Sequence, residues 1–253
     1  MATKILTPYR LFYIDESENM FSLMKDGRVL KNKKTFSFQS VNSDLSTISG
    51  VVFDGEKSHI FVSELNFDDT LPKKIASFSG YYYYPSMNEK FKKMAILEVN
   101  LLDKVGYATL CIYRKKIKYW TKEKEIQAKM TPPFFFNDDS FLYVDENNLL
   151  VLCDGDTKQI ICSNVERFCV SSSKQKIAYY DGTSIITINL TSKEKISEFQ
   201  VNHLTAMTFS ENEKDIYYAT SFERQNFIYQ YDCDTDKISL LTATNQTVTF
   251  MGI

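Results

Sequence analysis

Apolar and polar residues alternate over short runs along the chain, and tight polar turns separate one run from the next. Three segments in the last half can be aligned on this pattern: LVLCDGDTKQIIC from Leu150, IITINLTSKEKIS from Ile185 and IYQYDCDTDKISL from Ile228. Each begins with an alternating run, continues with a polar turn and ends with a second run that opens with isoleucine. This pattern predicts an antiparallel β-hairpin in each segment.

A second pair of predicted strands precedes each hairpin, at residues 134–144, 167–180 and 206–219. The complete unit therefore has four short strands in meander order. Earlier copies of the unit are looser, and the first has only three strands; they occupy residues 11–31, 47–65 and 94–128.

The repeat has a period of about 40 residues, which is typical of β-propellers. The residues assigned to the second strand of each unit are Leu11, Ile60, Tyr107, Leu142, Ile177 and Ile216. The last predicted strand, Thr247–Ile253, belongs to no unit, and the N-terminal unit lacks its first strand. Pairing these two ends would close a ring and remove two exposed sheet edges.

We therefore predict an all-β protein in which residues 1–253 form a single domain. The expected fold is one β-propeller of about six four-stranded blades, with five or seven as alternatives. The C-terminal strand is expected to close the ring by pairing with the N-terminal blade.

Two segments carry a resemblance to known propeller repeats. IYQYDCDTDKISLLT resembles the third strand and turn of WD40-type blades, with Tyr231 and Asp232 where those repeats carry Trp-Asp. SENEKDIYYAT, from Ser210, resembles the SPDGKxIAY segment of TolB-like repeats. The chain departs from WD40 repeats because it lacks their Gly-His and Trp-Asp pairs, and the first half fits less well. The resemblance implies a platform for protein–protein interaction.

The composition narrows the function classes. With 253 residues and a formal charge of −2, the chain has no global attraction for nucleic acid or anionic lipid. It contains no GxGxxG or GxxxxGK[ST] motif, no signal-peptide pattern and no apolar run long enough to span a bilayer. The five cysteines show no CxxC spacing, so we expect free thiols, several of them buried, in a cytoplasmic protein.

Candidate metal ligands are few. Asp232, Asp234 and Asp236 could bind a cation or form a turn, but the aligned middle hairpin has Leu190 and Ser192 in place of the first two. We therefore interpret these aspartates as turn residues, which accept hydrogen bonds from nearby backbone. The two histidines fall in different units. We predict neither a cofactor nor a metal, and we favour a protein without catalytic activity over an enzyme.

Three aspartates share one position, directly after the predicted second strand: Asp15, Asp145 and Asp181. The commoner explanation of this position is a turn in which aspartate accepts backbone N–H bonds. The alternative is an acidic ring on one face, which could serve a glycan-acting hydrolase or a carbohydrate-binding propeller, because glycosidases use paired carboxylates.

Two regions are candidates for a partner-binding surface. CIYRKKIKYWTKEKE, from Cys111, places Arg114, Lys116 and Lys118 close to Trp120, a mixture that can also bind single-stranded nucleic acid. Strand alternation should put its aromatic and charged side chains on opposite faces, so a solvated outer hairpin is the commoner explanation.

The second region is the tyrosine run, which comprises Tyr81, Tyr82, Tyr83 and Tyr84. Alternation along a strand prevents all four side chains from being buried, and exposed tyrosine is enriched at binding hot spots. An equally good explanation is an irregular blade edge with half of the tyrosines in the core. The leading hypothesis is a non-catalytic scaffold or adaptor that contacts protein partners through these two regions. Nucleic acid and membrane are not expected as partners.

Overall fold

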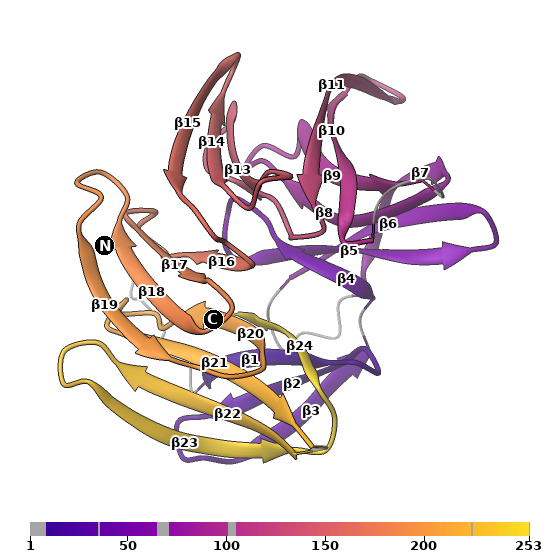
Figure 1. The fold of residues 1–253 in the computed structure, drawn as a ribbon. Helices are drawn as coiled ribbons and strands as arrows, with labels where there is room; N and C mark the ends of the chain where they lie inside the picture. Colours follow the sequence, from indigo (N-terminus) through magenta and orange to yellow (C-terminus); the bar gives the residue numbers. More distant parts are fainter. Residues whose placement is uncertain (1–8, 35, 65–70, 101–104, 224, 253) are drawn as a thin grey trace, which may run out of the picture.

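The computed structural model describes residues 9–34, 36–64, 71–100, 105–223 and 225–252. These residues form six antiparallel sheets of four strands each, and the sheets surround a common centre (Figure 1). Consecutive strands pair in meander order, as the alternating runs predict. The described residues include no helix that could cross a membrane.

Each sheet is one blade and extends from an innermost strand at the centre to an outermost strand at the rim. Blade 1 contains, in that order, β24 (Val248–Gly252), β1 (Tyr9–Asp15), β2 (Asn19–Met24) and β3 (Val29–Lys34). Blade 2 contains β4 (Ser37–Val41), β5 (Thr47–Asp54), β6 (Lys57–Glu64) and β7 (Lys73–Ser79). Blade 3 contains β8 (Tyr81–Met87), β9 (Lys93–Val99), β10 (Tyr107–Lys115) and β11 (Trp120–Lys129).

The second half of the chain is built in the same way. Blade 4 contains β12 (Phe134–Phe135), β13 (Ser140–Val144), β14 (Leu150–Asp154) and β15 (Thr157–Cys162). Blade 5 contains β16 (Arg167–Val170), β17 (Lys176–Tyr180), β18 (Ser184–Asn189) and β19 (Lys195–Gln200). Blade 6 contains β20 (Leu204–Phe209), β21 (Asp215–Phe222), β22 (Gln225–Asp232) and β23 (Lys237–Thr244).

The hydrophobic core is divided among the contacts between neighbouring blades. The described residues form six buried clusters, and each cluster joins one pair of adjacent blades around the ring. Between blades 6 and 1, for example, Leu11 and Tyr13 pack against Tyr217 and Ile228. Because both faces of the inner strands are covered in this way, the buried stretches contain consecutive apolar residues instead of strict alternation.

The ring is closed by the strand pairing expected from the two ends of the chain. Tyr13 of β1 lies opposite Met251 of β24, and Ile14 lies opposite Phe250. Beyond the ladder, the Glu16 backbone N–H donates to the Thr247 carbonyl at 2.9 Å. The predicted single, closed propeller of four-stranded blades is therefore confirmed, and the blade number is six.

Meander order gives the ring two distinct faces. The turns between first and second strands, and those between third and fourth strands, lie on one face of the ring, which we call the front face. The turns between second and third strands, together with the linkers between blades, form the back face. On the front face, for instance, the Lys115 N–H donates to the Lys92 carbonyl at 2.8 Å; on the back face, the Met130 N–H donates to the Gly106 carbonyl at 2.8 Å.

The strand assignment from sequence is wrong at two positions in the first half. Ile60 and Tyr107 lie in β6 and β10, which are the third strands of their blades and not the second. The interval between the second and third repeat contains two strands, β7 and β8, and these complete blade 2 and begin blade 3. Apart from this shift, the predicted four-stranded units and the three-strand N-terminal unit are confirmed.

Candidate functional site

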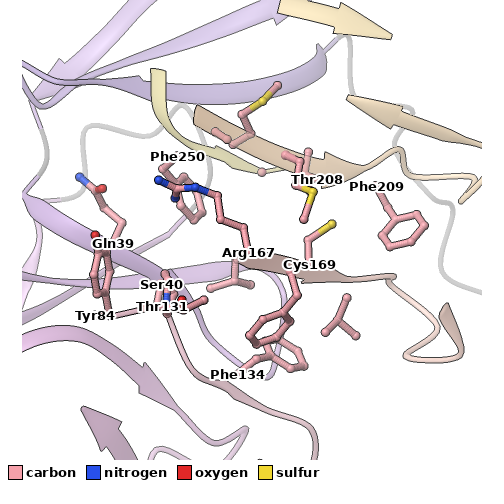
Figure 2. A pocket seen from close by; sticks show the side chains of 18 of the residues that line it. Gln39, Ser40, Tyr84, Thr131, Phe134, Arg167, Cys169, Thr208, Phe209 and Phe250 are labelled. Atoms are coloured by element: carbon pink, nitrogen blue, oxygen red, sulfur yellow. The ribbon is translucent and has the colours of Figure 1, made fainter. Parts of the chain in front are cut away.

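A cavity of about 140 Å³ lies on the axis of the ring, and we call it the central cavity. Its walls are formed by residues of all six innermost strands or of the segments next to them. Most of the lining is apolar and includes Phe134, Met207 and Phe250. Figure 2 shows the lining side chains around the opening. The meander therefore brings together residues that are distant in the sequence.

Of the described residues that line the central cavity, Arg167 alone is charged. It is the first residue of β16, and its side chain extends across the cavity in the direction of Gln39 and Phe250 (Figure 2). The side chain remains accessible to solvent, and among the described residues it forms no salt bridge or side-chain hydrogen bond. The wall therefore presents one uncompensated positive charge.

Tyr84 lies near this arginine. Burial raises the pKa of Tyr84, and the positive charge of Arg167 opposes that rise. The register of β8 shifts between Tyr83 and Ser86, and Tyr84 has a φ of 51°. A positive φ is unusual for a bulky residue, and such β-bulges re-aim side chains. The bulge places Tyr84 in the cavity wall in place of the outward position that regular alternation predicts.

The Ser40 hydroxyl is a second unusual group in the same wall. Ser40 belongs to β4 and is 1% exposed, yet its Oγ has no hydrogen-bond partner among the described residues. Buried polar groups are rarely unpaired, because each one costs about 1–3 kcal/mol. Two other polar side chains of the wall are paired: Thr131 donates to the Glu166 carbonyl at 3.1 Å, and Ser172 donates to Glu213 at 2.7 Å.

Lys174 spans the front end of the channel. Its Nζ donates to the Ser43 hydroxyl of blade 2 at 3.1 Å and to the Phe136 carbonyl of blade 4 at 2.9 Å. Burial lowers the pKa of Lys174, although the carboxylates of the front face raise it. Arg167 starts its strand on the back face. The exposed Arg167 therefore lies at the back-face end of the central cavity.

The hairpin that carries Arg114, Lys116, Lys118 and Trp120 consists of β10 and β11, the two outer strands of blade 3. Its base packs against blade 2, where Trp120 joins the buried cluster and donates from Nε1 to the Ile75 carbonyl at 3.4 Å. The tip, residues 116–119, projects on the front face. Ile117 and Tyr119 in the tip are 97% and 66% exposed, and Lys116 and Lys118 are also exposed.

The distribution of charged and aromatic side chains over the two faces of this hairpin differs from the expectation based on the sequence. Lys115 lies opposite Trp120, and Tyr113 lies opposite Lys122. The Lys115 and Lys122 ammonium groups lie 5.9 and 5.8 Å from the ring centroids of Trp120 and Tyr113, respectively. The prediction that charges and aromatics occupy opposite faces is therefore wrong for these pairs. The reason is that long lysine stems pack along an aromatic surface while the ammonium group stays accessible.

Solved structures similar to this chain were found at low sequence identity. TolB from Acinetobacter baumannii matches with a TM-score of 0.69 and 13% identity over 96% of this chain and 66% of the TolB chain. A chain of a nidogen/laminin complex matches with a TM-score of 0.67 and 9% identity, covering 96% of this chain and 97% of the other. No protein-family model and no curated protein matches the chain.

The protein is a six-bladed β-propeller. A putative 6-phosphogluconolactonase from Bacteroides fragilis is also similar in structure, with a TM-score of 0.59, 8% identity and 99% coverage of both chains. At these identities the similarity shows the fold alone. The chain spans about two thirds of the length of the TolB chain that it matches.

The tyrosine run forms part of β8, the innermost strand of blade 3. Tyr81 is 44% exposed, whereas Tyr82 is 5% exposed and its hydroxyl lies 3.3 Å from that of Tyr113. Tyr83 is half-buried and packs edge-on against Phe38. Only Tyr81 is therefore freely available to a macromolecule. It lies at the back face, whereas the hairpin tip lies at the front face, so the two predicted contact regions do not form one surface.

The three aspartates of the proposed acidic ring occupy the predicted place, in the turns of the back face. Each one accepts two backbone N–H bonds: Asp15 from Ser17 and Asn19, Asp145 from Asn147 and Leu149, and Asp181 from Thr183 and Ser184. The turn interpretation is confirmed. None of the three lines the central cavity, so the geometry gives no support to the carbohydrate-acting alternative.

The aspartates of the last hairpin are also turn residues. Asp232 accepts from the N–H groups of Asp234 and Thr235 at 2.9 and 3.0 Å. In the described part of the chain, the ligand atoms of Glu98, Cys111 and Glu125 come close enough to surround an ion. Lys122 Nζ already contacts Glu98 at 2.8 Å and Glu125 at 2.7 Å, so this cluster has its own cation. All five cysteines are free thiols, as expected.

Proposed function

We propose that this propeller is a non-catalytic interaction platform that binds a protein partner through the hairpin tip, residues 116–119. The observation that supports the proposal is the 97% exposure of Ile117, next to the 66% exposed Tyr119. Burying an isoleucine side chain contributes about 1.5–3 kcal/mol, and nothing within the described chain covers this one. A partner would supply the missing contact.

The base of the hairpin supports this role because it is held firmly. Trp120 and Tyr113 belong to the cluster between blades 2 and 3, and the β10–β11 ladder extends to Lys115 opposite Trp120. Arg114 forms a salt bridge with Glu123 across the two strands. A tip on such a base loses little conformational entropy on binding, which favours affinity.

The charges of the tip indicate the chemistry of the partner. Lys116 and Lys118 form no salt bridge with any described residue, in contrast to Arg114. A partner surface with an apolar pocket rimmed by aspartate or glutamate would complement two lysines that flank an isoleucine. Such rim charges increase the association rate and make binding sensitive to salt.

The test is a pair of double variants. Replacing Ile117 and Tyr119 with serine should remove a partner that the immobilised wild-type propeller retains from an extract of its source. With that partner purified, the tip variant should bind at least about tenfold more weakly, equivalent to about 1.4 kcal/mol. Unfolding by urea should change by less than about 0.5 kcal/mol, because both side chains are on the surface.

The control variant replaces Ile160 and Ile238 with serine, since these isoleucines are 60% and 51% exposed on the outer strands β15 and β23. It should retain the partner as the wild type does. Equal retention by the tip variant would contradict the proposal. Loss of the retained species after ribonuclease treatment would also contradict it, because the partner would then be RNA.

A further inference from the structure

The central cavity combines three features that point to a small ligand. It has one uncompensated cation, Arg167, and one buried hydroxyl without a partner, Ser40. The Tyr84 side chain, which lines the same cavity, contributes a further hydroxyl that no described residue bonds. These three groups come from blades 5, 2 and 3, so a ligand between them would bridge opposite sides of the ring.

The size of the cavity restricts the ligand. Drug-sized sites have volumes of about 300–1,000 Å³, and an apolar cavity of about 150 Å³ is sufficient for benzene. The 140 Å³ of the central cavity therefore fits a compact body of that size. Sugars that carry several phosphates, nucleotides and peptides are too large to be enclosed.

The charge of Arg167 and the apolar lining of the cavity restrict the ligand further. A guanidinium group binds a carboxylate through two parallel hydrogen bonds. Among the described residues that line the cavity, Arg167 alone is charged, so it balances a monoanion but not a phosphate with about two negative charges at neutral pH. The remaining wall, with Phe134, Met207 and Phe250, matches an apolar or aromatic body.

We propose that the central cavity is a binding site for a small organic monocarboxylate. The carboxylate pairs with Arg167 at the back-face opening, and its apolar body occupies the channel between Phe134 and Phe250. The Ser40 hydroxyl donates to the bound ligand. Entry is from the back face, because Lys174 spans the front end of the channel.

The experiment uses benzoate as the probe and isothermal titration of the full chain as the measurement. Benzyl alcohol, which has the same ring without the charge, and inorganic phosphate are titrated in parallel. Benzoate should bind saturably and more tightly than either. Arg167→Gln should weaken benzoate binding by about tenfold or more, since a hydrogen bond to a charged group is lost. Arg28→Gln is the control, because Arg28 is an exposed arginine whose partner is Asp26.

A second pair of variants tests the hydroxyl. Ser40→Ala should weaken benzoate binding by about threefold or more without loss of stability, because an unpaired buried hydroxyl contributes nothing favourable to folding. Thr187→Val is the matched control, since the Thr187 hydroxyl is also buried and unpaired but does not line the cavity. It should leave benzoate affinity unchanged.

Several results would overturn the proposal. They are an absence of saturable benzoate binding to the wild type, equal affinity in Arg167→Gln, and binding of benzyl alcohol or phosphate as tight as that of benzoate. Equal benzoate affinity in Ser40→Ala and Thr187→Val would overturn the role of the Ser40 hydroxyl. Circular dichroism of each variant confirms that it is folded, so a loss of binding is attributable to the side chain.

Discussion

The aspartates that follow the second strands show how one side chain defines a turn. Asp181 accepts hydrogen bonds from the Thr183 N–H at 2.9 Å and the Ser184 N–H at 2.8 Å. Burial alone would raise the pKa of Asp181, but these bonds to the carboxylate hold the pKa below its usual value. A carboxylate whose pKa is lower in the folded state stabilises the protein above its unfolded pKa. That stability is lost as the pH falls through the lowered value.

Replacing Asp181 with asparagine should therefore make the propeller less sensitive to acid. The amide oxygen can still accept the backbone bonds, but it does not titrate. Urea unfolding at pH 7 and pH 3 measures the change, and the loss of stability between these values should be smaller in Asp181→Asn than in the wild type. Asp154→Asn is the control, because the Asp154 carboxylate is exposed and forms no hydrogen bond with any described residue. An equal loss in both variants would contradict the assignment.

At the scale of single residues, the sequence predicts the role of a side chain when that role depends only on neighbouring positions in the chain. The turn function of Asp15 and Asp232 follows from their position after a strand, because such bonds involve residues only a few positions away. The residues of the central cavity are not predictable in this way. Arg167, Ser40 and Tyr84 are distant in sequence and meet only in the closed ring, and Tyr84 reaches the wall through a bulge that alternation does not reveal.

At the scale of elements, the first strand pair of blade 2 has a tight internal contact. Gly50 of β5 lies against the fully buried Phe36, and a Cβ at Gly50 would be 2.8 Å from the Ser37 carbonyl oxygen. The register of the pair shifts between Ser37 and Ser40, so β4 approaches β5 unusually closely there. The absence of a side chain at Gly50 permits this approach.

Gly50→Ala should therefore destabilise the propeller by about 1–3 kcal/mol, as overpacking of a core does. The free energy of unfolding in urea measures the effect. Gly27→Ala provides a comparison, because an added Cβ there meets nothing within 4 Å and the cost comes from its φ of 85° alone. Gly50→Ala with wild-type stability would show that β4 can move away without cost.

The hairpins of the last half are predictable because each one has a clear alternation and a short turn. Strands β7 and β8 are not separable from the sequence alone. Gly80 alone joins the two strands, whose sequences are KKIASFS and YYYYPSM. Neither sequence shows a regular period of two in its apolar residues. In β8 a bulge and Pro85 interrupt the alternation, so the pattern that identifies other strands is absent there.

At the scale of the molecule, the six sheets depend on one another through the clusters between blades. Closure through β24 is predictable because an incomplete first unit and a surplus last strand complement each other. Met251 is 3% exposed in the cluster between blades 6 and 1, and it lies opposite Tyr13. Closure therefore depends on apolar packing as well as on the ladder.

Met251→Asp should destabilise the ring by about 3–5 kcal/mol, because it buries a charge without a partner. Urea unfolding of this variant should begin at lower denaturant concentration and with lower cooperativity than that of the wild type. Ala243→Asp, on the exposed side of the outer strand β23, should change stability by less than about 0.5 kcal/mol. Similar effects from the two variants would contradict closure as the main determinant.

The position of β24 beside β1 also governs the order of events during translation. The Thr249 hydroxyl bonds to the Ile14 carbonyl across 235 positions of the sequence, at 3.3 Å. Ribosomes add about 5–20 residues per second, so the free edge of β1 waits on the order of 10–50 seconds for its partner. During that interval the nascent chain has an open strand edge that could pair with another molecule. The first blade to be synthesised is therefore the last to be completed, and it is the part of the nascent chain for which protection by a chaperone matters most.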